Sequence, residues 1–432
     1  MLETIRKAWK VPELRKKLTF VAMILMVFRL GNNIPVPFID TNALQGYFNA
    51  ASSSILGLMN VMSGGSFGHA TMLALSIQPY INASIIIQLL TVAIPPLERL
   101  RKDGGEAGRK KIEAITRYST LALGLLQGFG YYMLIRTNGF LSDKSVWAAV
   151  VIITTFTAGS VFVMWLGEQI TEFGVGNGIS ILLFAGIISR VPSAVFYMFT
   201  GARNYVNGVK TEGSFSLHPA LIPAFIIGVI LMLVFIVFIS LSERRIPVQY
   251  AKRVVGRKMY GGQSTNIPIK VNMSGVMPII FAQTIASIPA TIAAFVPSMA
   301  NSTFMKVFDT TGVVYCVVYA LLIVGFSYFY ATIQFNPVEV ANNLKKQGGF
   351  IPGYRAGRPT AEFLGRILNR ITMFGAIYLA IVAILPIVTG AIFKISALAI
   401  GGTSVLIVVS VALDTQKSLE ATMMMKQYKG FL

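Results

Sequence analysis

Runs of about 20 consecutive apolar residues recur along this chain of 432 residues and constrain its fold more than any other feature. A run of this length can cross the hydrocarbon core of a bilayer as an α-helix. We identify ten such spans, at about 18–35, 76–94, 115–135, 146–167, 179–199, 220–241, 275–296, 313–334, 371–390 and 401–418. Only 12% of the residues are charged, which is roughly half the fraction usual in soluble proteins. The sequence therefore predicts an all-α polytopic membrane protein with ten transmembrane helices.

Basic residues are concentrated on one side of these spans. Of the 37 Lys and Arg residues, 29 lie before span 1, in the loops after spans 2, 6 and 8, and in the C-terminal tail. Seven lie on the other side, and Arg29 is inside span 1. Because cytoplasmic loops of membrane proteins carry an excess of Lys and Arg, we expect both termini in the cytoplasm.

The loop between spans 1 and 2 is unusual because it is long, almost uncharged and rich in glycine and serine. Its centre reads Ser63-Gly64-Gly65-Ser66-Phe67-Gly68. The loop is too apolar for a solvated linker and too interrupted for a span. A re-entrant segment buried within the protein fits this composition.

The sequence lacks the motifs expected of a metal site, a nucleotide-binding site or an intramembrane active site. The single cysteine, Cys316, excludes an internal disulfide, and His69 and His218 are too far apart to suggest a metal site. No phosphate-binding glycine loop is present. The glycines of Gly174–Gly178 are interpreted as a helix junction, because no strand precedes them. No Asp or Glu lies in the middle of a span, which argues against an intramembrane protease or an ion-coupled transporter. Arg29 is expected to be structural or to snorkel to the interface.

Several segments, in order on the predicted spans, carry a family resemblance. They are Pro79–Leu90 (PYINASIIIQLL), Gly104–Lys111 with Tyr118, Trp165–Glu172 with Gly176–Ser180, Tyr250–Arg253, Pro268–Asn272, Phe335–Pro337, Asn343–Lys346, Pro352–Arg355 and Gly401–Ser404. Together they resemble the SecY family of protein-conducting channel subunits over nearly the whole chain. The resemblance implies two pseudo-symmetric five-helix halves around an hourglass pore, residues 1–200 with spans 1–5 and residues 201–432 with spans 6–10. It also implies a non-enzymatic channel in the plasma membrane that passes unfolded preproteins and releases transmembrane segments sideways into lipid, with no cofactor or metal.

The family's pore ring is an apolar constriction. Its positions correspond to Ile81, Ile85, Leu183, Ile187, Ile280 and Ile407. Ile81 and Ile85, like Leu183 and Ile187, are four residues apart and share a helix face. Spacing alone would also fit ordinary core or lipid-facing aliphatic residues, so the assignment depends on the resemblance. A dry aliphatic constriction blocks ions without requiring any particular sequence in the passing chain.

The resemblance also assigns a plug and a lateral gate. The plug corresponds to about 57–70, including Gly64, Gly65, Ser66, Phe67 and Gly68, and its glycines permit close packing and displacement. The gate between spans 2–3 and 7–8 has polar positions. Thr91 and Gln127 correspond to these positions, and Gln283 and Thr284, which follow Ile280 on span 7, are expected to complete the cluster. The four side chains would form a modest latch or serve only as structural contacts between helices.

Two basic cytoplasmic loops, about 243–274 and 336–370, are long enough to bind a partner. Their candidate contacts are Lys252, Arg253, Arg257, Lys258 and Arg355, and such clusters can also orient the protein at anionic lipid. The resemblance implies SecE and SecG as subunits, and the motor SecA or a ribosome on these loops. Signal sequences and membrane lipid are further expected partners, with no direct nucleic-acid function.

Two alternatives remain open. A secondary transporter is also built from broken helices around a central site, but it would need ionisable or cation-coordinating groups at the midplane. A membrane-insertion scaffold without a pore would not need a plug segment.

Overall fold

A computed structural model describes residues 2–50, 60, 63–102, 104–206, 219, 221–250, 253–255, 258–260, 264–295, 312–393 and 402–429. The chain divides into two compact units. Unit 1 comprises Met1–Pro219, Ser287–Gly312 and Thr389–Leu432, and unit 2 comprises Ala220–Ala286 and Val313–Val388. The predicted division into residues 1–200 and 201–432 stays a prediction.

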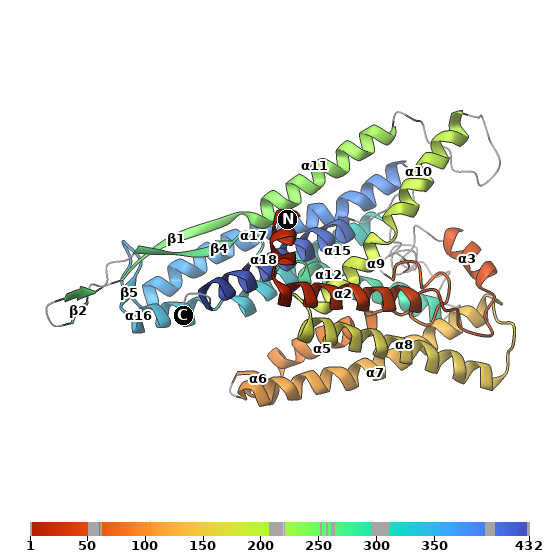
Figure 1. Cartoon of the computed structure of the whole chain (residues 1–432), viewed down its shortest axis with the longest axis horizontal. Helices are drawn as coiled ribbons and strands as arrows, with labels where there is room; N and C mark the ends of the chain where they lie inside the picture. The colour runs from red at the N-terminus through yellow and green to blue at the C-terminus, as the bar shows by residue number, and fades with distance from the viewer. Residues whose placement is uncertain are drawn as a thin grey trace. The chain divides into compact units, whose positions relative to one another are not determined.

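Helices make up the described part of unit 1 (Figure 1). They are α1 (Leu2–Trp9), α2 (Pro12–Gly31), α3 (Thr41–Ala50), α5 (Gln78–Ala93), α6 (Pro95–Lys102), α7 (Gly105–Thr137), α8 (Val146–Phe173), α9 (Gly178–Ile188), α10 (Val191–Val206) and α18 (Gly402–Lys429). Unit 2 contains α11 (Leu221–Leu241), β1 (Glu243–Tyr250), β2 (Arg253–Val255), β3 (Lys258–Tyr260), β4 (Ser264–Lys270), α15 (Val313–Gln334), α16 (Pro337–Lys346) and β5 (Gly349–Phe350). Two helices, α12 (Met277–Phe295) and α17 (Arg358–Phe393), begin in unit 2 and end in unit 1.

Each of the ten predicted spans coincides with helix. Span 5 is divided between α9 and α10, and the other nine fall on α2, α5, α7, α8, α11, α12, α15, α17 and α18. By length and apolar composition, four described helices qualify as membrane spans, or five if the bent pair α5–α6 is one span. The mostly helical membrane architecture is therefore supported, while the number of ten spans stays a prediction.

Helices α5, α7 and α8 pack side by side in unit 1 (Figure 1). The contact of α7 with α8 is close because Gly124 and Gly128 face Thr157. A Cβ atom built on Gly124 would lie 3.3 Å from the Thr157 methyl group. Glycines four residues apart let helix backbones approach within a membrane. Helix α5 ends before Pro95-Pro96, and α6 continues at an angle of 104°.

The N-terminal helix α1 packs on α18, near the end of the chain. Ala8 is fully buried there, and the Thr4 hydroxyl donates to Glu420 at 3.3 Å. Trp9 is half exposed. On the exposed face, a hydrogen bond from Lys7 and its charge lower the pKa of Glu3. The segment that precedes span 1 is therefore a helix attached to the body of unit 1.

Unit 2 contains a small antiparallel sheet of order β4-β1-β5 that the sequence analysis does not predict. Strand β1 pairs with β4 from Glu243 opposite Lys270 to Gln249 opposite Ser264. Its alternate residues Ile246 and Val248 are buried against an apolar cluster that includes Leu344 and Leu364. The described residues of the basic loop after α11 therefore form paired strands.

Candidate functional site

Five of the six ring candidates lie on buried helix faces in unit 1. Ile81 and Ile85 of α5 are 8% and 5% exposed, whereas Ile86 on the same helix is 44% exposed. The remaining candidates in this unit are buried to a similar degree: Leu183 and Ile187 of α9, and Ile407 of α18. Helix α9 packs against α18. Each i, i+4 pair therefore shares the buried face of its helix.

The sixth candidate, Ile280, lies on α12 in unit 2 and is half-buried. Its carbonyl oxygen accepts a hydrogen bond from the Thr284 hydroxyl at 2.9 Å. Since the candidates are distributed over both units, their convergence into one ring stays a prediction.

The direction of α9 is set by a compact junction with α8. The Asn177 side-chain oxygen caps α9 by accepting from the amides of Ile179 (3.1 Å) and Ser180 (3.3 Å). The Gly178 amide donates to the Thr171 hydroxyl oxygen at 2.9 Å. A Cβ atom on Gly178 would lie 2.0 Å from the Gly167 carbonyl oxygen, so only glycine allows this approach. The motif Trp165–Ser180 thus positions Leu183 and Ile187.

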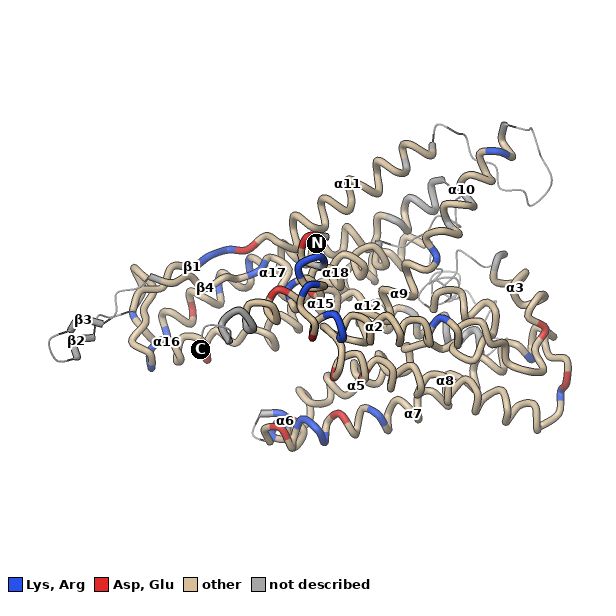
Figure 2. Tube along the Cα trace, viewed as in Figure 1, with Lys and Arg blue, Asp and Glu red and all other residues tan. Residues whose placement is uncertain are grey.

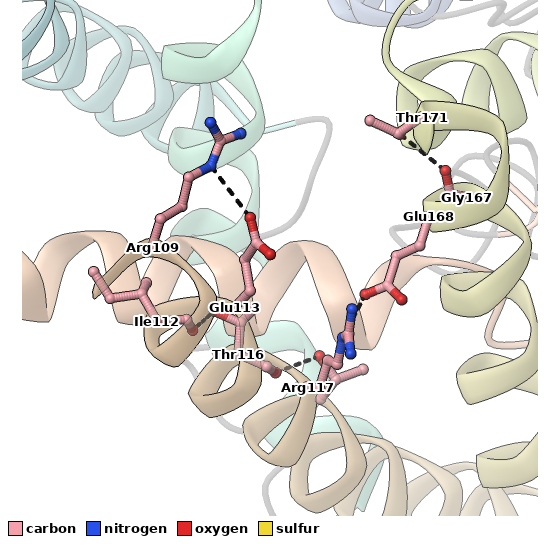
Figure 3. A network of polar contacts seen from close by, with 9 residues as sticks. Arg109, Ile112, Glu113, Thr116, Arg117, Gly167, Glu168 and Thr171 are labelled. Atoms are coloured by element: carbon pink, nitrogen blue, oxygen red, sulfur yellow. Dashed lines mark hydrogen bonds and ion pairs between the residues drawn. The ribbon is translucent and has the colours of Figure 1, made fainter. Parts of the chain in front are cut away.

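An ion pair joins α7 to the same end of α8 (Figure 3). The Arg117 Nε atom lies 2.7 Å from Glu168 Oε1, and their side chains are 53% and 26% exposed. One turn away, Arg109 pairs with Glu113 at 3.3 Å. Because both pairs reach solvent, each contributes on the order of 1 kcal/mol or less. The Arg109–Glu113 pair lies within α7, whereas the Arg117–Glu168 pair holds the basic start of α7 (Figure 2) against α8.

Segment 63–71, which contains the described C-terminal part of the predicted plug, is largely buried in unit 1. Gly64 and Gly65 have φ values of +70° and +96°, which glycine adopts readily. A Cβ atom on Gly64 would lie 3.0 Å from the Ser189 hydroxyl oxygen and 3.1 Å from the Gly186 carbonyl oxygen. The segment therefore packs on the C-terminal end of α9. Of the predicted plug, residues 57–59, 61 and 62 lie outside the described residues.

The side chain of Phe67 anchors this segment within unit 1. Its ring stacks on Tyr131 of α7 with centroids 4.2 Å apart, and meets Phe48 of α3 edge-on at 5.3 Å. The Tyr131 hydroxyl donates to the Phe67 carbonyl oxygen. Sequence reasoning did not identify Tyr131. The only signal was a Tyr131-Tyr132 pair in an aliphatic span, where a buried hydroxyl needs a partner.

The four gate candidates divide equally between the units. Thr91 is buried on α5 and donates to the Gln88 carbonyl oxygen at 2.7 Å. On α7, the Gln127 side-chain oxygen is buried with no hydrogen-bond partner among the described residues. Gln283 and Thr284 lie on α12 within unit 2. A gate formed from all four stays a prediction.

The candidate partner contacts lie in unit 2. Lys252 and Arg257 fall outside the described residues, whereas Arg253 begins β2 and Lys258 begins β3. Arg355 is exposed, and its carbonyl oxygen accepts from the Thr360 hydroxyl at 2.7 Å. The preceding Tyr354 ring stacks on Phe363 with centroids 4.0 Å apart. The backbone around Arg355 is therefore held in place by these contacts, and its side chain is exposed to solvent.

Comparisons with known proteins agree with this arrangement of segments. The sequence model of the SecY family matches residues 71–416. The chain is 44% identical to the protein translocase subunit SecY of Streptomyces coelicolor over 448 aligned positions, which cover all of both chains. This chain belongs to the SecY family. The family predicted from the sequence motifs is thereby confirmed.

Solved structures support the helical fold expected of a SecY family member. A structure described as a protein conducting channel matches with a TM-score of 0.65 at 19% identity, covering 96% of each chain. Sec61 in the canine ribosome-channel complex matches with a TM-score of 0.61 at 16% identity, again over 96% of each chain. At these identities the likeness shows the fold. Within the described residues, no group of three or more His, Cys, Asp or Glu side chains is arranged to hold a metal ion.

Proposed function

We propose that this protein is a passive protein-conducting channel that passes unfolded preproteins across a membrane and releases transmembrane segments laterally into lipid. The observation that carries the proposal is full-length membership of the SecY family, with 44% identity to a protein translocase subunit. The buried aliphatic faces of α5, α9 and α18 supply a surface suited to chains of any sequence. A partner protein provides the energy for moving the preprotein through the channel.

In this proposal, the channel is sealed by two elements. The first is a ring of Ile81, Ile85, Leu183, Ile187, Ile280 and Ile407, whose aliphatic side chains exclude water and so block ions. The second is the plug, which includes Gly64, Gly65, Ser66, Phe67 and Gly68. The burial of five ring candidates and the packing of Gly64 on the end of α9 support this assignment.

A lateral gate between α5–α7 and α12–α15 lets apolar segments enter the bilayer. Thr91, Gln127, Gln283 and Thr284 form its polar latch, with each interhelical hydrogen bond worth on the order of 1 kcal/mol. The Gln127 side-chain oxygen is buried with no hydrogen-bond partner in the described part of the chain, which supports a polar position that exchanges partners when the gate moves. A signal sequence shifts the equilibrium by binding the open gate.

The partners are SecE and SecG within the membrane, and SecA or a ribosome on the basic loops through Lys252, Arg253, Arg257, Lys258 and Arg355. A structural relative in a ribosome-channel complex supports the ribosome as a partner. The protein lies in the plasma membrane with both termini in the cytoplasm, since 29 of the 37 basic residues are on that side of the predicted spans. Gentle solubilisation should copurify a small SecE-like subunit.

The test is reconstitution. Liposomes containing this chain with a SecE-like subunit, SecA and ATP should protect a labelled preprotein from added protease. Liposomes lacking the chain, or a preprotein lacking its signal sequence, should give no protection. Absence of protection in the complete system would contradict the proposal. Coupled uptake of a small solute instead would favour the secondary transporter.

A further inference from the structure

Segment 63–71 is fixed by its own hydrogen bonds as well as by packing. The Gly65 amide donates to the Asn60 carbonyl oxygen at 2.8 Å, and the Gly68 amide donates to the Asn60 side-chain oxygen, also at 2.8 Å. The Phe67 amide donates to the Ser63 hydroxyl oxygen at 3.1 Å. These bonds give the segment a defined shape, but they do not attach it to the surrounding helices.

Besides the packing of Gly64 on α9, the segment is attached to α7 and α8 through Phe67. Its ring is 4% exposed and lies in one aromatic cluster with Phe48, Tyr131 and Phe156. Tyr131 contacts Phe67 twice, by ring stacking and by its hydroxyl, which donates to the Phe67 carbonyl oxygen. Tyr131 also packs on Phe156 of α8 with ring centroids 5.0 Å apart. A single side chain thus links the segment to both α7 and α8.

The hydrogen bond matters because the Phe67 carbonyl is in a buried part of the chain. A buried carbonyl that loses its partner is costly, whereas the cost disappears when the group reaches water. Removing the Tyr131 hydroxyl therefore destabilises the seated segment and leaves the displaced segment unchanged. The aromatic ring remains to fill the space, so the helix packing of unit 1 is retained.

We propose that Tyr131 is a positioning residue that latches the plug in its seated state through the Phe67 carbonyl and ring. This inference rests on the proposed function, in which segment 63–68 closes the channel. The latch uses different side chains from the aliphatic ring, since the ring residues lie on α5, α9, α12 and α18 whereas Tyr131 lies on α7. Closure then depends on two sets of contacts made by different residues.

The test compares Tyr131→Phe with the parent in the full-length protein purified with its SecE-like subunit. Hydrogen exchange at the Phe67 and Gly68 amides should accelerate by on the order of tenfold, because the seated state loses one buried hydrogen bond. Tyr132→Phe is the matched control. Tyr132 is the neighbouring residue and is as well buried, at 4% exposed. Because Phe67 stacks on Tyr131 and is bonded to the Tyr131 hydroxyl, Tyr132→Phe should leave exchange in the segment unchanged. Phe67→Leu removes the stacked ring but retains the carbonyl, and it should accelerate exchange independently.

Resting ion conductance in planar bilayers tests the sealing role of the plug separately from the latch at Tyr131. Faster exchange with raised conductance in Tyr131→Phe supports both the latch and the plug function. Faster exchange with parental conductance supports the latch and contradicts the plug's role in sealing. Parental exchange in both Tyr131→Phe and Phe67→Leu would overturn the latch, whatever the conductance.

Discussion

At the residue scale, the proposed seal depends on side chains that are apolar and buried but not otherwise distinctive. Ile81 and Ile85 of α5 differ from the exposed Ile86 only in the helix face they occupy. Helical spacing predicts that each pair shares a face, and the structure confirms this for α5 and α9. Spacing could not show which buried aliphatic residues line a pore, because core and pore positions have the same composition. That assignment came from the family motifs and stays a proposal.

Polar substitution in the ring should open a path for ions. We expect Ile81→Asn and Ile407→Asn to raise resting conductance several-fold, because an amide lowers the barrier to wetting an apolar constriction. The same variants should accept defective signal sequences more readily. Ile81→Leu and Ile407→Leu are the matched controls and should remain as tight as the parent. Conductance of the Asn variants equal to the parent would show that these positions do not form the seal.

At the element scale, unit 1 is held together by close approaches at glycine. Gly159 of α8 faces the chain that follows the plug, and a Cβ atom there would lie 1.9 Å from the Met72 carbonyl oxygen.

Apolar runs predict the helices well, because the bilayer imposes a length of about 20 residues. The sheet at 243–270 was not predicted, because Pro247 separates the inward-facing Ile246 and Val248 and proline is uncommon within strands. Contacts such as Phe67–Tyr131 join residues 64 positions apart, and no local pattern encodes them.

A methyl group at Gly159 should push α8 away from this segment. We expect Gly159→Ala to destabilise the folded protein by about 1–3 kcal/mol through overpacking. Thermal unfolding of the detergent-solubilised protein measures the effect. Gly365→Ala in α17 is the control, because a Cβ atom there meets nothing within 4 Å and alanine favours helix. Equal melting temperatures for Gly159→Ala and Gly365→Ala would contradict the packing.

The basic loop before α17 should bind a partner by charge. Arg355→Glu should reduce export driven by SecA, and stimulation of the SecA ATPase, several-fold, because reversal replaces attraction with repulsion at the contact. Membrane insertion of the variant itself should be normal. Arg136→Glu, on the opposite side in the predicted topology, makes the same charge change and should leave stimulation unaltered. Parental stimulation by Arg355→Glu would remove this residue from the interface.

At the scale of the whole molecule, the distribution of basic residues predicts an orientation that the structure does not test. Reporter fusions in the loops after spans 2, 6 and 8 should read cytoplasmic, and fusions after spans 1, 5 and 9 should read external. The loop after span 4 has no basic residue, so its neighbours must determine its side. One reversed loop would overturn the ten-span topology.

The most direct measurement of the channel itself is cross-linking to a chain arrested during translocation. Photoreactive residues placed at Ile81, Ile187 and Ile407 should each cross-link to the arrested preprotein. A photoreactive residue at Leu231, which is 64% exposed on α11, should cross-link to lipid instead. Cross-links to the preprotein from all three ring positions, and none from Leu231, are the predicted result. Cross-links to the preprotein at Leu231 with none at the three ring positions would contradict a path through this protein's aliphatic ring.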